Sequence, residues 1–359
     1  RSGGFKEEFL LEKGDIITPL TEQAIGLLGS TARIPESGKY IQSQDIAKID
    51  CNESLLDKDF AFYLISSAFV KQQLSAAAQQ TKIRHTSPDK IKECTVWIPS
   101  LDIQKRIGRI LTDIDNKIAI NRQINDNLEA MAKQLYDYWF VQFDFPNEEG
   151  KPYKSSGGAM VWNEKLKREI PQEWSDCKLK DFINLFDSKR VPLSSKDRGE
   201  RQGVYPYYGA TGIMDYVNDY IFDGDYILLA EDGSTSDAKG FPIVQYIWGK
   251  NWVNNHAHII LPKNERYTMF TYQMLRSIPA KQIETGSIQK KISQENLCGY
   301  KMVLPNSDLL EKYENVVSPL WEKRKRCIEE INTLTKQRDE LLPLLMNGQA
   351  SVNYHLSDD

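Results

Sequence analysis

The sequence predicts an α+β protein in which two homologous, strand-rich domains are separated by two long helices that pair as an antiparallel coiled coil. Two observations lead to this prediction. A stretch of mixed sequence recurs 206 residues later, and each copy is followed by a long segment with apolar residues spaced three and four apart. A chain of 359 residues is also longer than a single ordinary core requires, so two domains are expected.

The repeat is clearest in two segments that end near a proline. Residues 79–102 (QQTKIRHTSPDKIKECTVWIPSLD) resemble residues 284–308 (ETGSIQKKISQENLCGYKMVLPNSD), and Pro305 lies 206 residues after Pro99. A period of this length indicates a duplicated domain rather than a solenoid of short repeats. Each copy has the pattern of short strands, a basic polar loop, an apolar strand ending in proline, and a long helix.

A second match upstream shows that the two copies differ in length. KGDIITP at residues 13–19 parallels DGDYILL at residues 223–229, at an offset near 210. Residue 1 therefore corresponds to about residue 211, and residues 170–211 have no counterpart upstream. We expect the first domain to lack its N-terminal strands in this chain.

Both long helices carry a stripe that must be buried against a partner. In the second helix the stripe comprises Leu310, Tyr313, Val317, Leu320, Arg324, Cys327, Ile331, Leu334, Arg338, Leu341 and Leu345. In the first helix it comprises Ile103, Ile107, Ile110, Ile114, Ile118, Asn121, Ile124, Leu128, Met131, Leu135 and Tyr138. Because the duplication supplies a matched partner, we expect the two helices to pair within the chain. A homodimer zipper and packing against the domains are the alternatives. Asn121 would be a polar seam residue, which often fixes register.

These patterns give the expected domain boundaries. They are residues 1–101 for the first domain, 102–145 for the first long helix, 146–169 for a linker, 170–307 for the second domain, 308–348 for the second long helix, and 349–359 for a tail.

Composition narrows the location and the class of function. The chain has no run of 18 apolar residues and no signal-peptide pattern at its start, so we expect no membrane segment. Its five cysteines form no Cys-x-x-Cys pair, which favours reduced thiols in the cytoplasm. The net charge is −4, so any contact with nucleic acid must come from local clusters of Lys and Arg.

Catalytic signatures are missing from the sequence. It contains neither a G-x-x-x-x-G-K-[ST] phosphate loop nor a G-x-S-x-G nucleophile turn. His256 and His258 alternate as on one face of a strand, but no third ligand is spaced to complete a metal site. The acidic residues from Asp223 to Asp232 fit tight turns better than a nuclease centre. We therefore expect no catalytic residue and no metal.

Three segments of the second domain combine loop character with groups that read base edges or contact phosphates. They are GVYPYYGATGIMDY (203–216), AEDGSTSDAKG (230–240) and TGSIQKKIS (285–293), and the repeat partner of the third is QQTKIRHTS (79–87). The candidate DNA-binding residues in these segments are Gln80, Thr81, Lys82, Arg84, His85, Tyr205, Tyr207, Tyr208, Thr211, Ser234, Thr235, Lys239, Ser287, Gln289, Lys290 and Lys291.

Each of these segments also has a structural interpretation. The tyrosines can be core residues of a strand pair, the loop at 230–240 can be an ordinary solvated loop, and the basic loops can be solvated charge runs. The run WEKRKR at residues 321–326 is more typical of a solvated helix face. The recurrence of a basic, amide-rich loop at the same place in both copies favours DNA reading for that loop.

Further motifs, in their order along the chain, resemble the specificity subunits of type I restriction-modification systems. NLEAMAKQLYDYWFVQFDFP (127–146) is similar to the end of that family's central conserved helix, and RDELLPLLMNGQASV (338–352) to the end of its C-terminal conserved helix. YPYYGATGI followed by GDYILLAEDGS resembles the start of a target recognition domain. The resemblance covers essentially the whole chain, and only the short first domain departs from it.

The resemblance implies a DNA-binding subunit without an active site of its own. In this family each target recognition domain reads one half of an asymmetric, bipartite DNA site, and the helices set the number of unread base pairs between the halves. The implied partners are double-stranded DNA, methyltransferase subunits that methylate adenine, and a restriction/translocase subunit. S-adenosylmethionine, ATP and Mg²⁺ would belong to those subunits, so we expect no cofactor on this chain.

The aromatic residues at the end of the first helix have two interpretations. They are Tyr138, Trp139, Phe140, Phe143 and Phe145. Packing of the helix end against the next domain is favoured, and a docking patch for a methyltransferase subunit is the alternative.

Two other functions remain open from the sequence. One is a sequence-specific DNA-binding protein that works without methyltransferase partners, such as a repressor. The other is a scaffold whose helices join two protein-binding domains. A fused enzyme is disfavoured by the missing catalytic motifs.

Overall fold

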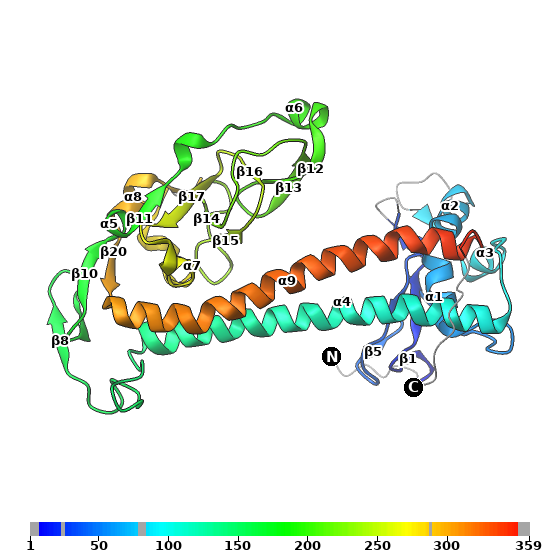
Figure 1. Cartoon of the computed structure of the whole chain (residues 1–359). Helices are drawn as coiled ribbons and strands as arrows, with labels where there is room; N and C mark the ends of the chain where they lie inside the picture. Colours follow the sequence, from blue (N-terminus) through cyan, green and yellow to red (C-terminus); the bar gives the residue numbers. More distant parts are fainter. Residues whose placement is uncertain (1–6, 23–25, 78–83, 287–288, 351–359) are drawn as a thin grey trace. The chain divides into compact units, whose positions relative to one another are not determined.

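The computed structural model describes residues 7–22, 26–77, 84–286 and 289–350. The chain divides into two compact units, residues 1–125 with 326–359, and residues 126–325. Two long helices, α4 (Leu101–Tyr136) and α9 (Ser307–Met346), each contribute residues to both units (Figure 1). Among the described residues, no helix is long and apolar enough to cross a membrane.

The first unit contains a small antiparallel sheet with strand order β4-β2-β6. Ile16 in the central strand is fully buried and pairs with Ile49. Asp57 accepts a hydrogen bond from the Phe60 N–H and so caps the N-terminus of α1. The elements are β1 (Leu10–Leu11), β2 (Ile16–Pro19), β3 (Thr21–Glu22), β4 (Ala32–Arg33), β5 (Tyr40–Ile41), β6 (Ile46–Ile49), α1 (Lys58–Ser66), α2 (Ala68–Ala77), β7 (Arg84–His85) and α3 (Pro88–Lys92).

The second unit is built on a four-stranded sheet with order β11-β17-β14-β15 and a three-stranded sheet with order β13-β12-β16. The runs YILLA and AHIILP form its central strands because nearly every residue in them is apolar and buried. The strands are β8 (Met160–Asn163), β9 (Arg168–Pro171), β10 (Ser175–Lys178), β11 (Ile183–Leu185), β12 (Gln202–Tyr208), β13 (Ile213–Val217), β14 (Tyr226–Ala230), β15 (Val244–Ile247), β16 (Trp252–Val253), β17 (Ala257–Pro262), β18 (Glu284–Thr285), β19 (Lys291–Ile292) and β20 (Lys301–Leu304). The helices are α5 (Leu179–Phe182), α6 (Ser195–Glu200), α7 (Thr268–Ser277) and α8 (Gln294–Gly299).

The repeat predicted from the sequence is present in the structure. α4 begins at Leu101 and α9 begins 206 residues later at Ser307. Ser87 caps the N-terminus of α3, and Ser293, at the same offset, caps the N-terminus of α8. The two domains are therefore homologous in fold as well as in sequence.

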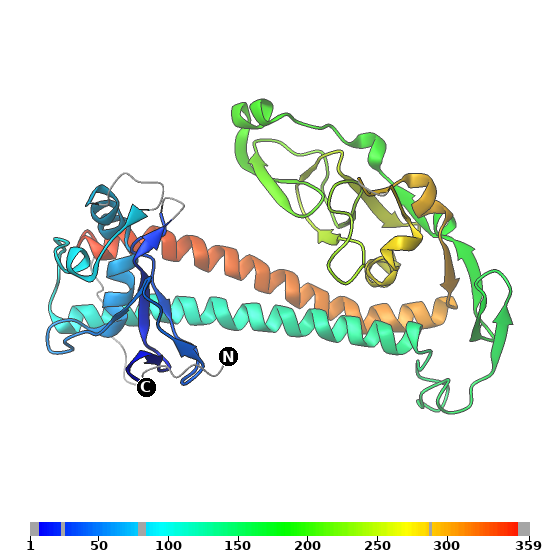
Figure 2. The same cartoon turned by 180° about the vertical axis from the view of Figure 1, so that it is seen from behind.

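The two long helices pair with each other in an antiparallel direction, as predicted. In the second unit, Arg324 forms an ion pair with Glu129, and the Tyr313 hydroxyl donates to the Ala132 carbonyl. In the first unit, Arg338 forms an ion pair with Asp115. In the second unit Glu129 contacts Arg324 and the later Ala132 contacts the earlier Tyr313, so residue numbers rise along α4 as they fall along α9. The first unit shows the same order, because Asp115 contacts Arg338 and Asn121 contacts Glu330. Figures 1 and 2 show the helix segments side by side in each unit.

Asn121 is buried in the helix seam, as predicted. Its side chain donates a hydrogen bond of 2.9 Å to Glu330, which also pairs with Lys117. A buried amide that is satisfied by an opposing carboxylate disfavours any shift of one helix along the other. This network is therefore suited to fixing the register of the pair.

The predicted seam of the first helix is wrong at three positions. Ile103, Met131 and Tyr138 are exposed, with 40%, 51% and 38% of their surface accessible. The buried line passes instead through Ala132 and Tyr136. A straight α-helix drifts by about 20° per heptad relative to a strict 3.5-residue repeat, so a stripe drawn from spacing alone leaves the buried face over a long helix.

The end of α4 is anchored in the aromatic core of the second unit. The helix continues as a π-helical turn to Val141, short of the expected residue 145. The Phe140 ring lies 4.9 Å from that of Phe270 and 5.0 Å from that of Tyr313, both edge-on. The buried aromatics of the helix end are Trp139, Phe140, Phe143 and Phe145. The packing interpretation is confirmed for these four, while Tyr138 remains partly exposed.

Candidate nucleic-acid interface

The predicted DNA-reading segments of the second domain begin at one end of its four-stranded sheet. β14 ends at Ala230, which pairs with Ala257 at the start of β17. The polar loop of residues 231–243 leaves the sheet here, and the hairpin formed by β18 and β19 is joined to it. The Ile292 N–H donates to the Glu231 carbonyl at 2.8 Å, and Lys291 bridges to Asp232. The structure therefore brings two of the three segments together.

Side chains join the loop to the hairpin as well. The Thr235 hydroxyl is buried and donates to the Glu284 carboxylate at 2.6 Å. Lys290 pairs with the same carboxylate at 3.0 Å. Thr235 thus holds the two segments together, whereas Ser234 and Lys239 are exposed on the loop.

The third segment forms the hairpin of β12 and β13, and its tip reaches the same end of the sheet. The Gln245 side chain donates to the carbonyls of Gly209 and Ala210 at 3.0 Å each. Tyr207 is buried, and its hydroxyl accepts a hydrogen bond from the Leu193 N–H, so this tyrosine packs in the core. The other candidates here are Tyr205 and Tyr208, which are half-buried, and Thr211, which is exposed.

The basic residues of the hairpin are charge-matched by carboxylates. Lys291 lies 3.2 Å from Glu231, which also pairs with Arg190 at 2.7 Å. Burial raises the pKa of Glu231, but the hydrogen bonds and charges of its cationic partners outweigh burial and hold the pKa below its ordinary value. A DNA phosphate would therefore compete with a carboxylate for each lysine.

Beneath the hairpin lies a cluster of Asp187, Glu231 and His258, whose potential ligand atoms lie within 4.8 Å of one another; Asp187 and His258 are buried and Glu231 is half-buried. The His258 ring is fully buried, with Nδ1 2.6 Å from Asp187 and Nε2 2.8 Å from the Ile292 carbonyl. Each potential ligand thus already has a partner, and Arg190 adds positive charge beside both carboxylates. The cluster supports the hairpin from below through the chain's own contacts, and the expectation of no metal stays a prediction.

The first domain repeats this attachment. The Thr86 N–H donates to the Leu20 carbonyl at 2.8 Å, which matches the bond from Ile292 to Glu231. Arg84 is half-buried and pairs with Glu22 at 3.2 Å, while His85 is exposed. The remaining candidates of the two basic segments (residues 79–87 and 285–293) include Gln80, Thr81, Lys82 and Ser287, which lie outside the described residues. Gln289, Lys290 and Lys291 are exposed.

The structure adds a turn that the sequence did not single out. In the second domain the Glu231 N–H donates to the carbonyl of His256, and the His256 ring lies 2.6 Å from Asp232 at the surface. In the first domain the Leu20 N–H donates to the carbonyl of Asp45, and this bond and the bond from Glu231 to His256 are both 2.8 Å long. Glu231 lies 211 residues after Leu20, and His256 lies 211 residues after Asp45. An alignment of the two copies that extends into these loops would therefore have identified the turns.

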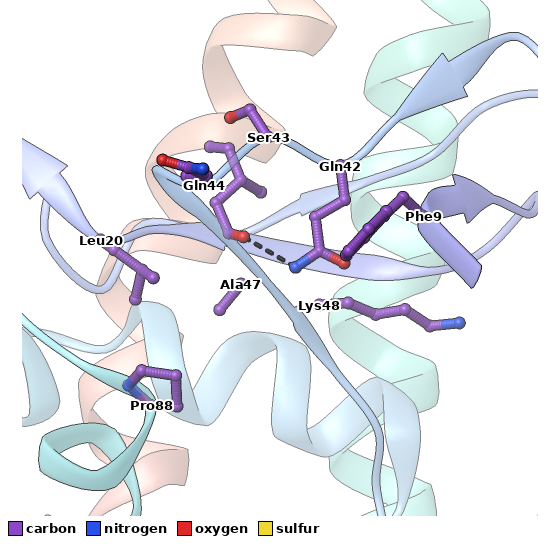
Figure 3. Close-up of a pocket in the computed structure, with 9 residues that line it drawn as sticks. Phe9, Leu20, Gln42, Ser43, Gln44, Ala47, Lys48 and Pro88 are labelled. Atoms are coloured by element: carbon purple, nitrogen blue, oxygen red, sulfur yellow. Dashed lines mark hydrogen bonds between the residues drawn. The ribbon is translucent and has the colours of Figure 1, made fainter. Parts of the chain in front are cut away.

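A cavity of about 370 Å³ lies beside the turn in the first domain. Figure 3 shows Gln42, Ser43 and Gln44 along it, with Leu20 and Pro88 on the other elements. The Gln42 side chain donates to the Ile46 carbonyl at 2.9 Å and so braces the turn (Figure 3). The cavity therefore opens at the edge where β7 is attached.

Comparison with known proteins agrees with this architecture. The model of the type I restriction modification DNA specificity domain matches residues 2–130 and 171–314. The chain is 23% identical over 353 residues to the MjaIX type I restriction enzyme specificity subunit of Methanocaldococcus jannaschii, covering 91% of this chain and 78% of that protein. It is 33% identical over 142 residues to a putative type I restriction enzyme specificity subunit of Haemophilus influenzae, covering 40% of this chain and 35% of that protein.

A solved structure shares the fold. The S subunit of a type I restriction-modification system from M. genitalium superposes with a TM-score of 0.61 at 18% identity, covering 96% of this chain and 85% of that one. Two copies of a DNA specificity domain, each followed by one of two paired helices, define a DNA-recognition protein. The chain belongs to the family of type I restriction-modification DNA specificity subunits, as its motifs predict.

Proposed function

We propose that each domain of this chain reads one half of an asymmetric, bipartite DNA site, and that the chain directs partner subunits rather than catalysing a reaction. The observation that carries this proposal is the repeated edge. The basic segment is attached by an equivalent hydrogen bond in both domains, from Thr86 to Leu20 and from Ile292 to Glu231, and the same two residues bond to equivalent turns. A duplicated edge with basic residues in both copies is suited to two equivalent contacts with DNA.

The asymmetry of the site follows from the side chains at that edge. The equivalent pairing is made by Thr21 of β3 with His85 of β7 in the first domain, and by Asp232 with Lys291 in the second. A hydroxyl and an imidazole offer different donors and acceptors from a carboxylate and an ammonium group. The two domains are therefore expected to select different bases.

We also propose that the paired helices set the unread spacing between the two half-sites. One heptad inserted into α4 after Asn121 and one into α9 before Glu330 preserves the seam and lengthens both helices by roughly 10 Å. This length corresponds to at most about three base pairs of B-DNA. The spacer should lengthen while both half-sites stay unchanged, and altered half-sites would argue against the helices as a ruler.

Methyltransferase subunits of the type I system are the proposed direct partners, with a restriction/translocase subunit joining them. The exposed face at the end of α4 in the second unit supports this proposal. Met131, Tyr138 and Val141 are 51%, 38% and 47% exposed and recur at helical spacing. An apolar stripe left open on a helix is suited to packing against another helix. S-adenosylmethionine, ATP and Mg²⁺ would be bound by these partners.

Selection from a pool of random duplex DNA tests the proposed function. The chain is used alone and with its cognate methyltransferase subunits, and retained DNA is sequenced. We expect weak selection by the chain alone and a two-part motif with a fixed gap for the complex. Tight selection by the chain alone would identify a stand-alone DNA-binding protein such as a repressor. A lack of selection in both cases would identify a protein-binding scaffold.

A further inference from the structure

The turns before β6 and β17 present an exposed amide at equivalent positions. Gln44 lies one residue before Asp45, and Asn255 lies one residue before His256, so the two amides are also 211 residues apart. Both residues are exposed. In the part of the chain that the structure describes, neither side chain forms a hydrogen bond within the chain. Each amide is therefore free to bind an external group.

Gln42 and Asn254, which flank the free amides in the two turns, are used within the fold. Gln42 donates to the Ile46 carbonyl. Asn254 is buried, and its side-chain oxygen accepts the His256 N–H at 2.8 Å. Its backbone N–H donates to the Tyr208 carbonyl. These bonds hold each turn in a defined conformation, so the free amide is displayed by a fixed backbone.

Each amide lies at the edge that carries the basic segment of its domain, β7 in the first domain and the β18–β19 hairpin in the second. Leu20 donates its N–H to the turn, at Asp45, and its carbonyl accepts from Thr86, which directly follows β7. Glu231 makes the same two backbone bonds, to His256 and Ile292. In each domain the free amide therefore lies one residue from a backbone bond to Leu20 or Glu231, and the same residue also bonds to the basic segment.

An amide at such a surface has a preferred base. Its N–H donates and its oxygen accepts, which matches the N7 acceptor and the N6 amino donor of adenine in the major groove. We propose that Gln44 and Asn255 are equivalent specificity-determining residues, each of which reads one adenine in the half-site of its own domain. This inference rests on the proposed DNA-reading function and adds the turns as a second reading element beside the basic segments.

The test compares motifs selected from random duplex DNA by the complex with its cognate methyltransferase subunits. Gln44→Ala should relax the preference for adenine at one position of one half-site, by between about 5-fold and 150-fold, which is the range for loss of a bidentate base contact. Asn255→Ala should do the same in the other half-site. Gln44→Glu and Asn255→Asp should shift these positions towards cytosine, because a carboxylate accepts from the cytosine N4 amino group.

Matched controls are Gln123→Ala and Asn127→Ala, which remove exposed amides from α4. They should leave both half-sites unchanged. The inference fails if the turn variants keep the wild-type motif, or if both alter the same half-site. Absence of any two-part motif with the unmodified chain would instead refute the proposed function itself, so the two failures are distinguishable.

Discussion

The lysines of the second hairpin give a prediction whose size follows from the ion pairs around them. Lys290 pairs with Glu284 at 3.0 Å, and Lys291 pairs with Glu231 at 3.2 Å, yet both lysines are exposed. We expect Lys290→Ala combined with Lys291→Ala to weaken DNA binding and to make it less sensitive to salt. Each lysine that neutralises a phosphate contributes about 0.9 to the slope of log affinity against log salt.

Two lost phosphate contacts should therefore reduce the slope by about 1.8. Between roughly 50 and 200 mM salt, the affinity of the variant should fall about 12-fold less than that of the unmodified chain. At low salt the variant should also lose more DNA affinity than the loss of two phosphate contacts accounts for, because an acidic residue is left unpaired beside the DNA. Glu284 keeps its bond from Thr235, but its negative charge is no longer balanced beside the DNA.

Fluorescence anisotropy of the complex with its cognate DNA, measured across a salt series, gives both quantities. The matched control is Lys165→Ala with Lys167→Ala, which removes two ion-paired lysines from the turn between β8 and β9. The control slope should stay unchanged. Equal slopes for the hairpin variant and the control would remove this hairpin from the DNA interface.

Three further changes test the fold around the interface. Burial raises the pKa of Glu314 from 4.5 to about 7, so its stabilising contribution is complete below pH 4.5 and is lost as the pH rises to about 7. In urea unfolding, the free energy of unfolding of Glu314→Gln should therefore rise by up to about 3 kcal/mol relative to that of the unmodified chain as the pH increases from 4.5 to 8. Phe140→Ala should cost about 3–5 kcal/mol by the same assay, because its ring fills the aromatic core at the end of α4. Gly286 has φ +87°, and an added Cβ would collide with the Gln289 carbonyl oxygen. Gly286→Ala should reduce DNA binding while the melting temperature changes little.

Long-period features could be predicted from the sequence. The 206-residue offset between Pro99 and Pro305 predicts where both long helices begin, because a duplicated fold keeps its element order. The seam predicts the pairing of the helices and the burial of Asn121. These signals extend over many residues, so local exceptions do not remove them.

Whether an individual side chain is buried or exposed could be predicted less well. Tyr207 and Thr235 occur in loop-like segments, yet both are buried. Tyr207 is buried because it lies in the paired strand β12, and Thr235 because it bonds to the Glu284 carboxylate. The turns with Gln44 and Asn255 were missed because a three-residue turn has no periodicity. Their place beside the basic segments depends on bonds between residues that are distant in the sequence.

Sequencing the methylated bases in DNA from a host that carries this chain with its cognate methyltransferase subunits tests the central claim most directly. The account predicts one motif of two short, different blocks separated by a fixed number of unspecified base pairs, with adenine methylated in the motif. A single continuous motif, or two identical blocks, would contradict the assignment of one different half-site to each domain.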